Sequence, residues 1–102
     1  MKYIRLGKKL VGIINHNNQF VIRRNKKKHF MRKYKAYGIS TKILMDLHKW
    51  GIKEIILIEE TEKGENAYLT TVENWIDNGI VDKFQDLEYQ NFLPLKYWKK
   101  IE

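Results

Sequence analysis

The chain has 102 residues, a formal net charge of +8 and no cysteine. This length is enough for one hydrophobic core, and 43% hydrophobic with 13% aromatic residues is the composition of a folded domain, which excludes a disordered tail. Disulfides and thiolate metal sites are excluded as well, and no apolar run reaches the length of a signal peptide or a membrane span. We therefore expect residues 1–102 to form a single compact domain in the cytoplasm.

Charge is distributed unevenly along the chain. Residues 1–53 contain fifteen Lys or Arg and one acid, Asp46, whereas residues 54–102 contain five Lys or Arg and eleven acids. A basic half can meet phosphates or an acidic partner, and an acidic half repels nucleic acid. The alternative is that the two halves neutralise one another across the fold.

The first predicted element is a β-hairpin over residues 9–24. Apolar, β-branched segments flank the polar cluster Asn15–Gln19, and Asn tolerates the left-handed backbone of tight turns. A second turn, at Asn25–Lys28, leads to a third strand over His29–Lys35. That strand has cations on both faces, which is typical of an edge strand.

An amphipathic helix is predicted from Thr41 to Trp50. Ser40 is a suitable N-cap, and Gly51 suits the left-handed residue that often follows a helix. Its apolar side chains have helical spacing: Ile43, Leu44, Leu47 and Trp50.

A nearly continuous apolar run, Ile52–Glu59, predicts a strand buried on both faces. The distance along the chain from the preceding strand is long enough for a parallel crossover, which places this strand at the centre of the sheet. The polar segment Thr61–Asn66 then predicts a turn, after which Ala67–Leu69 returns antiparallel.

The last third of the chain predicts short elements. Thr70 and Glu73 match a capping box before a helix over Thr71–Asn78, which ends at Gly79. We expect this helix to bury Val72, Trp75 and Ile76. Short strands follow at Ile80–Val81, continuing to Phe84, and at Gln90–Leu93. Pro94 suits the start of a final short helix carrying Leu95, Tyr97, Trp98 and Ile101.

These elements predict an α+β fold with a mixed or mainly antiparallel sheet, an N-terminal hairpin, one amphipathic helix on the sheet and short C-terminal helices. The three tryptophans, Trp50, Trp75 and Trp98, are expected in the core. The aromatic segment Phe92–Trp98 is expected there too, although an exposed part of it would suit docking or dimer formation.

The strongest functional signal is the basic segment Arg23–Tyr37, which has eight cations and three aromatic rings without one carboxylate. Cations neutralise phosphates and release counterions, while exposed rings stack on unpaired bases. The sequence thus predicts a basic nucleic-acid-binding protein, and it leaves DNA or RNA, single or double strand, open. The expected contact residues are Lys8, Lys9, Arg23, Arg24, Lys26, Lys27, Lys28, Arg32, Lys33, Tyr34, Lys35 and Tyr37.

A Mg²⁺-dependent nuclease is the enzymatic alternative, with Glu59, Glu60 and Glu73 as candidate metal ligands; otherwise no cofactor is expected. The predicted sheet with flanking helices is loosely similar to the core of restriction-endonuclease-like nucleases. That family has an acid followed by Glu-x-Lys or Asp-x-Lys within one strand. Here Lys63 directly follows Glu62 in a predicted turn, so the signature is missing, and a solvated hairpin tip also explains these acids.

Other site chemistries find no support. The histidines, His16, His29 and His48, lack the spacing of a metal site, and Ser40, the only serine, has no histidine near it in sequence. We find no glycine-rich phosphate loop and no nucleophile elbow.

The rhythm of residues 37–98 resembles small proteins carried by archaeal and phage mobile elements. The similarity rests on Tyr37–Ser40, Trp50–Ile52, Tyr68–Trp75 and Gln90–Leu95, and it transfers no catalytic residue. Such an origin, in a virus or plasmid, implies a DNA-handling or host-interaction protein. It also leaves open a protein-interaction module, either a homodimer or an inhibitor of a host defence complex whose acidic surface imitates nucleic acid.

Overall fold

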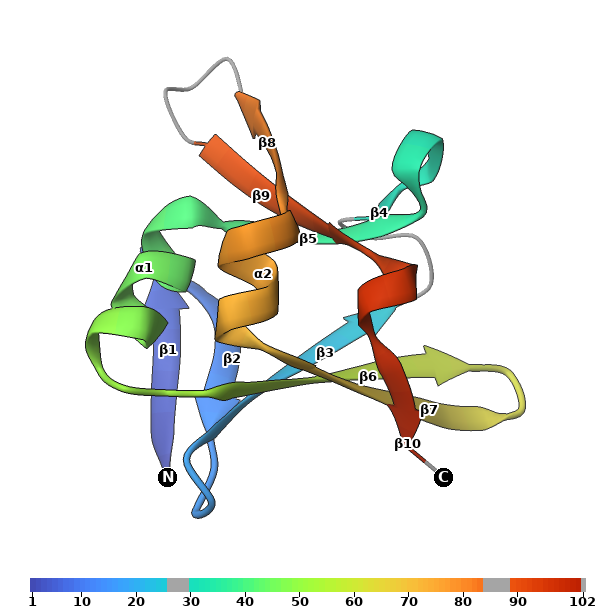
Figure 1. The fold of residues 1–102 in the computed structure, drawn as a ribbon. Coiled ribbons are helices and arrows are strands. Elements are labelled where there is room, and N and C mark those ends of the chain that lie inside the picture. The colour runs from blue at the N-terminus through green and yellow to red at the C-terminus, as the bar shows by residue number, and fades with distance from the viewer. Residues whose placement is uncertain (26–29, 84–88, 102) are drawn as a thin grey trace.

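The computed structural model describes residues 1–25, 30–83 and 89–101. Two β-sheets and two α-helices form this part of the chain, which confirms the predicted α+β class (Figure 1). The larger sheet has the strand order β1 (Lys2–Leu6), β2 (Lys9–Ile14), β3 (Gln19–Asn25), β6 (Glu54–Thr61), β7 (Gly64–Thr71) and β10 (Lys99–Ile101). The smaller sheet has the order β4 (Phe30–Met31), β5 (Ala36–Ser40), β9 (Tyr89–Pro94) and β8 (Ile80–Lys83).

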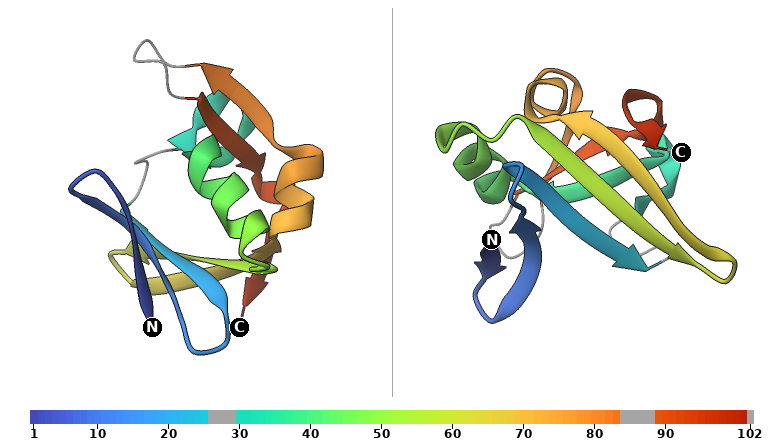
Figure 2. Two further views of the ribbon diagram at one scale, coloured as in Figure 1. Left: turned by 90° about the vertical axis from the view of Figure 1, so that its left-hand side faces the viewer. Right: turned by 90° about the horizontal axis from the view of Figure 1, so that it is seen from below.

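The helices α1 (Thr41–Lys49) and α2 (Val72–Asn78) lie on the same side of the larger sheet as the smaller sheet (Figures 1 and 2). Strands β3 and β6 are parallel, and the other described strand pairs are antiparallel. The connection from β3 to β6 passes through β5 and α1, and both strands lie in the middle of the sheet. The parallel crossover into β6 therefore starts from β3 and not from the predicted strand over His29–Lys35.

One hydrophobic cluster takes residues from both sheets and both helices. In β6, Ile55 and Leu57 are fully buried, whereas Ile56 and Ile58 are only partly covered. The prediction that this strand is buried on both faces is therefore wrong, because the smaller sheet and the helices cover one face of the larger sheet. The continuous apolar run does not distinguish a strand buried on one face from a strand buried on both.

The N-terminal hairpin is confirmed as β2 and β3, where Ile13 pairs with Val21. A further strand, β1, pairs with β2 across a turn in which Gly7 has a φ of 63°. The predicted third strand over His29–Lys35 is wrong for its described part. Strand β4 covers only two residues, a 3₁₀ turn η1 (Arg32–Tyr34) follows, and Lys35 ends that turn with a φ of 46°.

The two helices are close to their predicted ranges, but three details differ. Trp50 is 44% exposed, with the Lys2 ammonium 4.3 Å from its ring centroid, and Ile76 is 38% exposed. The α2 cap is Thr71, whose hydroxyl accepts from the Asn74 amide at 3.0 Å, so the predicted Thr70–Glu73 capping box does not form. The final helix is also shorter than predicted, since a 3₁₀ turn η2 (Leu95–Tyr97) leads directly into β10.

Candidate phosphate and nucleic-acid interface

The neighbouring residues Arg23 and Arg24 lie on opposite faces of β3, because successive side chains of a strand alternate. The Arg23 side chain is 58% exposed, and its guanidinium is 2.6 Å from a Glu65 carboxylate oxygen and 3.8 Å from one of Glu60. Parallel pairing of β3 with β6 and the β6–β7 hairpin bring these acids to it. Arg23 is thus partly neutralised by the acidic half of the chain.

Arg24 lies on the inner face, between the two sheets, and is only 9% exposed. Burial lowers the pKa of its guanidinium to about 10, so the side chain is still a cation at neutral pH. None of the described carboxylates forms an ion pair with it. A buried cation without a counter-ion is rare in folded proteins.

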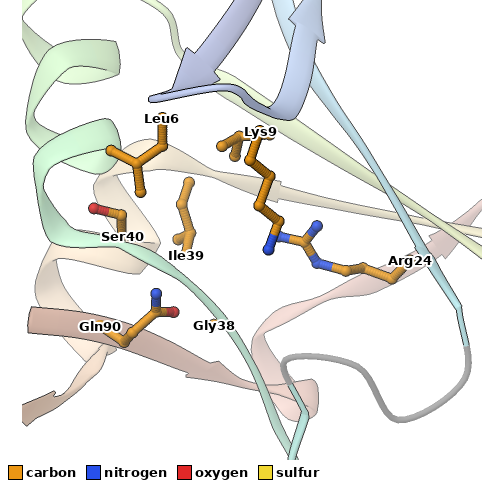
Figure 3. A pocket seen from close by; sticks show the side chains of 8 residues that line it. Leu6, Lys9, Arg24, Gly38, Ile39, Ser40 and Gln90 are labelled. Carbon is orange, nitrogen blue, oxygen red and sulfur yellow. The ribbon is translucent and has the colours of Figure 1, made fainter. Parts of the chain in front are cut away.

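Arg24 lines a cavity of about 40 Å³ between β2, β3, β5 and β9. Figure 3 shows the side chains of Lys9 and Arg24 both directed into it. The remaining lining residues are Leu6, Val11, Gly38, Ile39, Ser40 and Gln90. Two cations therefore share a small cavity whose other polar side chains are a hydroxyl and an amide.

Two of the polar lining groups have unused hydrogen-bonding capacity. The Gln90 side-chain oxygen is buried and accepts no hydrogen bond from the described part of the chain, and Ser40, directly before α1, makes no capping bond to that helix. In the sequence, Ser40 was notable only as an N-cap, and no local signal marks Gln90 or Gly38. The pairing of β5 with β9, which sets Ser40 opposite Gln90, brings them together.

Further cations lie exposed on other parts of the described surface. Lys8 is in the β1–β2 turn, and Arg32, Lys33 and Lys35 are in or beside η1, directly before β5. None of the four takes part in an ion pair with the described part of the chain. Three other predicted contact residues, Lys26, Lys27 and Lys28, lie outside the described residues.

The two tyrosines predicted to stack on bases have different environments. Tyr34 is 43% exposed, with the Lys33 ammonium 5.4 Å from its ring centroid. Tyr37 is 6% exposed, its ring packs on Phe30 at 5.0 Å between centroids, and its hydroxyl donates to the Glu59 carboxylate. The ring of Tyr34 is therefore accessible to solvent, whereas the ring and the hydroxyl of Tyr37 already have partners within the fold.

The candidate metal ligands are not brought together. Glu59 and Glu60 lie on opposite faces of β6, the first bonded to Tyr37 and the second beside Arg23. Glu73 lies in the first turn of α2, beyond the opposite end of the β6–β7 hairpin. The described ranges contain no group of three or more His, Asp or Glu side chains placed to hold a metal ion.

The chain matches no protein-family model, and no curated protein or solved structure was found to be significantly similar to it. The similarity to mobile-element proteins therefore stays a prediction. Neither of the α-helices in the described ranges is long and apolar enough to span a membrane. The C-terminal aromatic segment is mostly internal, since Phe92, Leu93 and Trp98 are each less than 9% exposed.

Proposed function

We propose that this protein binds nucleic acid through its phosphates, using the cations around the β1–β2 turn and η1. The observation that carries this proposal is that Lys8, Arg32, Lys33 and Lys35 are exposed and make no ion pair with a described carboxylate. An exposed cation without a protein partner can exchange its counterion for a phosphate, and release of that counterion favours binding.

The proposed contact surface contains fewer residues than the one predicted from the sequence. We leave out Arg23, because Glu60 and Glu65 already neutralise it, and Tyr37, because its ring is covered. Tyr34 stays as the candidate stacking residue, and stacking on a base contributes about 1 to 3 kcal/mol. Arg24 is left out as well, because it is buried on the inner face of β3. We call the remaining described residues the basic surface: Lys8, Lys9, Arg32, Lys33, Tyr34 and Lys35.

Exposed acidic residues restrict where nucleic acid can bind. Glu60, Glu62 and Glu65 are exposed at the tip of the β6–β7 hairpin, which projects away from α1 and β1 (Figure 1). Like charges repel phosphate, so a bound strand is expected to avoid this tip and to follow the basic surface.

Fluorescence anisotropy with labelled single-stranded DNA, duplex DNA and RNA tests the proposal over about 50 to 200 mM salt, a range in which proteins making six to ten phosphate contacts lose about 10³- to 10⁵-fold in affinity. The variant Arg32→Ala/Lys33→Ala/Lys35→Ala should bind more weakly to all sequences. If all three residues contact phosphates, the slope of log K against log salt should fall by about 2 to 3.

The matched control is Lys96→Ala/Lys99→Ala/Lys100→Ala, which removes the same charge beside β10, and includes a lysine over the neighbouring ring of Tyr97 as Lys33 lies over Tyr34. It should keep most of the affinity and slope. An equal loss in both variants would show attraction by net charge alone. No binding by the wild-type protein at low salt would contradict the proposal.

A further inference from the structure

We propose that the cavity between β2, β3, β5 and β9 binds one phosphate group, as a free ion or as the monoester at the end of a strand, with the Arg24 guanidinium as its main ligand. The site shares Lys9 with the basic surface, but the proposal does not depend on nucleic-acid binding.

The first argument is the environment of Arg24. Its side chain is nine-tenths buried, lines the cavity, and forms no ion pair or hydrogen bond with the described residues. A guanidinium has five N–H donors in a planar fork that matches two oxygens of a phosphate. Burial of such a group without an acceptor destabilises the folded protein, and an anion in the cavity would remove that destabilisation.

The second argument is the chemistry of the other lining groups. Lys9 contributes a second positive charge to the same cavity (Figure 3). The Ser40 hydroxyl can donate to a phosphate oxygen, and Ser40 places the positive N-terminal end of α1 beside the cavity. The unpaired Gln90 oxygen suits a protonated phosphate, whose hydroxyl can donate to it.

The third argument is size. A cavity of about 40 Å³ holds about three waters, if each needs ~10–15 Å³, and such a space suits a single tetrahedral anion. A nucleoside is far too large for it, and a phosphate inside a strand carries a sugar on each side. We therefore infer a free phosphate or a terminal phosphate monoester. The apolar wall formed by Leu6, Val11 and Ile39 limits hydration and strengthens the charge interactions.

Thermal unfolding in phosphate and in chloride at equal ionic strength tests this site. Wild-type protein should show a Tm that rises with phosphate concentration, as expected when a ligand binds only the folded state. Arg24→Met should lose this specific rise, and it should be at least as stable as wild type in chloride, because it removes a buried charge that has no ionic partner among the described residues. The matched control Arg23→Met removes the exposed neighbour and should keep the full phosphate response.

Comparing Arg24→Met with Arg23→Met separates specific phosphate binding from the general stabilising effect of phosphate on proteins. The general effect does not depend on one side chain, so it should be the same in both variants. An equal Tm rise in Arg24→Met and wild type, or no rise in wild type beyond that in chloride, would overturn the proposal. Since a variant can fail to fold, phosphate is also titrated into wild-type protein and followed by amide NMR. Shifts confined to the region of Gly38, Ile39, Ser40 and Gln90 support the site, and their absence contradicts it.

Two oligonucleotides of one sequence, one with a 5′-phosphate and one with a 5′-hydroxyl, distinguish the sources of the phosphate. A preference for the 5′-phosphate that Arg24→Met abolishes identifies a strand end as the ligand. Equal binding of the two, together with the Tm rise in orthophosphate, identifies free phosphate. Because the orthophosphate experiment contains no nucleic acid, this proposal and the nucleic-acid-binding proposal can fail independently.

Discussion

Glu59 influences two different tyrosines. The hydroxyl of Tyr37, from the smaller sheet, donates to its carboxylate, and Tyr68 lies nearby on the neighbouring strand β7. Burial of Tyr68 and the negative charge of Glu59 both raise the pKa of the Tyr68 phenol above its ordinary value of 10.0. Glu59 therefore acts within the fold, as an acceptor for one phenol and a perturbing charge for the other.

The raised pKa of Tyr68 predicts a loss of stability in alkali. Below pH 10, the phenol is neutral in both the folded and unfolded states and the free energy of unfolding does not depend on it. As the pH rises above 10, the unfolded chain loses this proton more readily than the folded protein, so the free energy of unfolding falls. Tyr68→Phe should reduce this fall, as measured by urea unfolding at a series of alkaline pH values.

Tyr3→Phe is the control for the Tyr68 experiment, because Tyr3 is 58% exposed on β1. It should leave the pH dependence close to that of wild type. An identical alkaline fall in Tyr68→Phe and wild type would show that Tyr68 does not contribute to it.

At the scale of single elements, the start of α2 shows how neighbouring threonines acquire different roles. Thr71 caps the helix, and the Thr70 hydroxyl instead donates to the Tyr97 carbonyl at 2.9 Å. The Thr-x-x-Glu spacing in the sequence favours Thr70 as the cap. Tertiary contact with η2 decides between them.

The Thr71 cap predicts a measurable stability difference. Thr71→Ala should lower the free energy of unfolding by about 1 kcal/mol, because the Asn74 amide loses its acceptor. Glu73→Gln should have a smaller effect, since Glu73 has only the helix dipole to favour its charge and no capping box to complete. Urea unfolding of the two variants measures this difference, and a larger loss in Glu73→Gln would contradict the assignment of the cap.

At the scale of the whole molecule, two tryptophans hold the C-terminal segment and α2 against the smaller sheet. The rings of Trp75 and Trp98 meet edge to face, with centroids 5.3 Å apart. Their indole N–H groups donate to carbonyl oxygens of the same strand, β9, at Asn91 and Leu93. These bonds connect β9 with α2 and with the residue that precedes β10.

Trp98 and Trp50 should therefore contribute differently to the free energy of unfolding. Trp98→Ala should lower the free energy of unfolding by about 3 to 5 kcal/mol, the usual range for truncating a buried aromatic residue. Trp50→Ala should cost far less, because Trp50 is 44% exposed and contacts Lys2 at the surface. Denaturant unfolding gives both values, and similar losses in the two variants would contradict this explanation.

Local sequence patterns predicted an element correctly where the residues of that element alone determine its structure. The hairpin around Asn15–Gln19, the helix α1 with Gly51 after it, and the strands β8 and β9 are confirmed. The turn η1 was missed because no glycine, proline, asparagine or aspartate interrupts the segment from Phe30 to Lys35. Its end at Lys35 depends on a left-handed backbone conformation, which lysine does not signal in a sequence.

The α+β class, the apolar faces of the core and the concentration of cations in the first half of the chain can be predicted from the sequence. They depend on composition and periodicity, which are properties of neighbouring residues. Whether a given cation is exposed, paired or buried depends instead on tertiary contacts. The parallel pairing of β3 with β6 gives Arg23 its acidic partners, and the smaller sheet encloses Arg24 beside Gln90. Such contacts join residues far apart along the chain, and no local pattern specifies them.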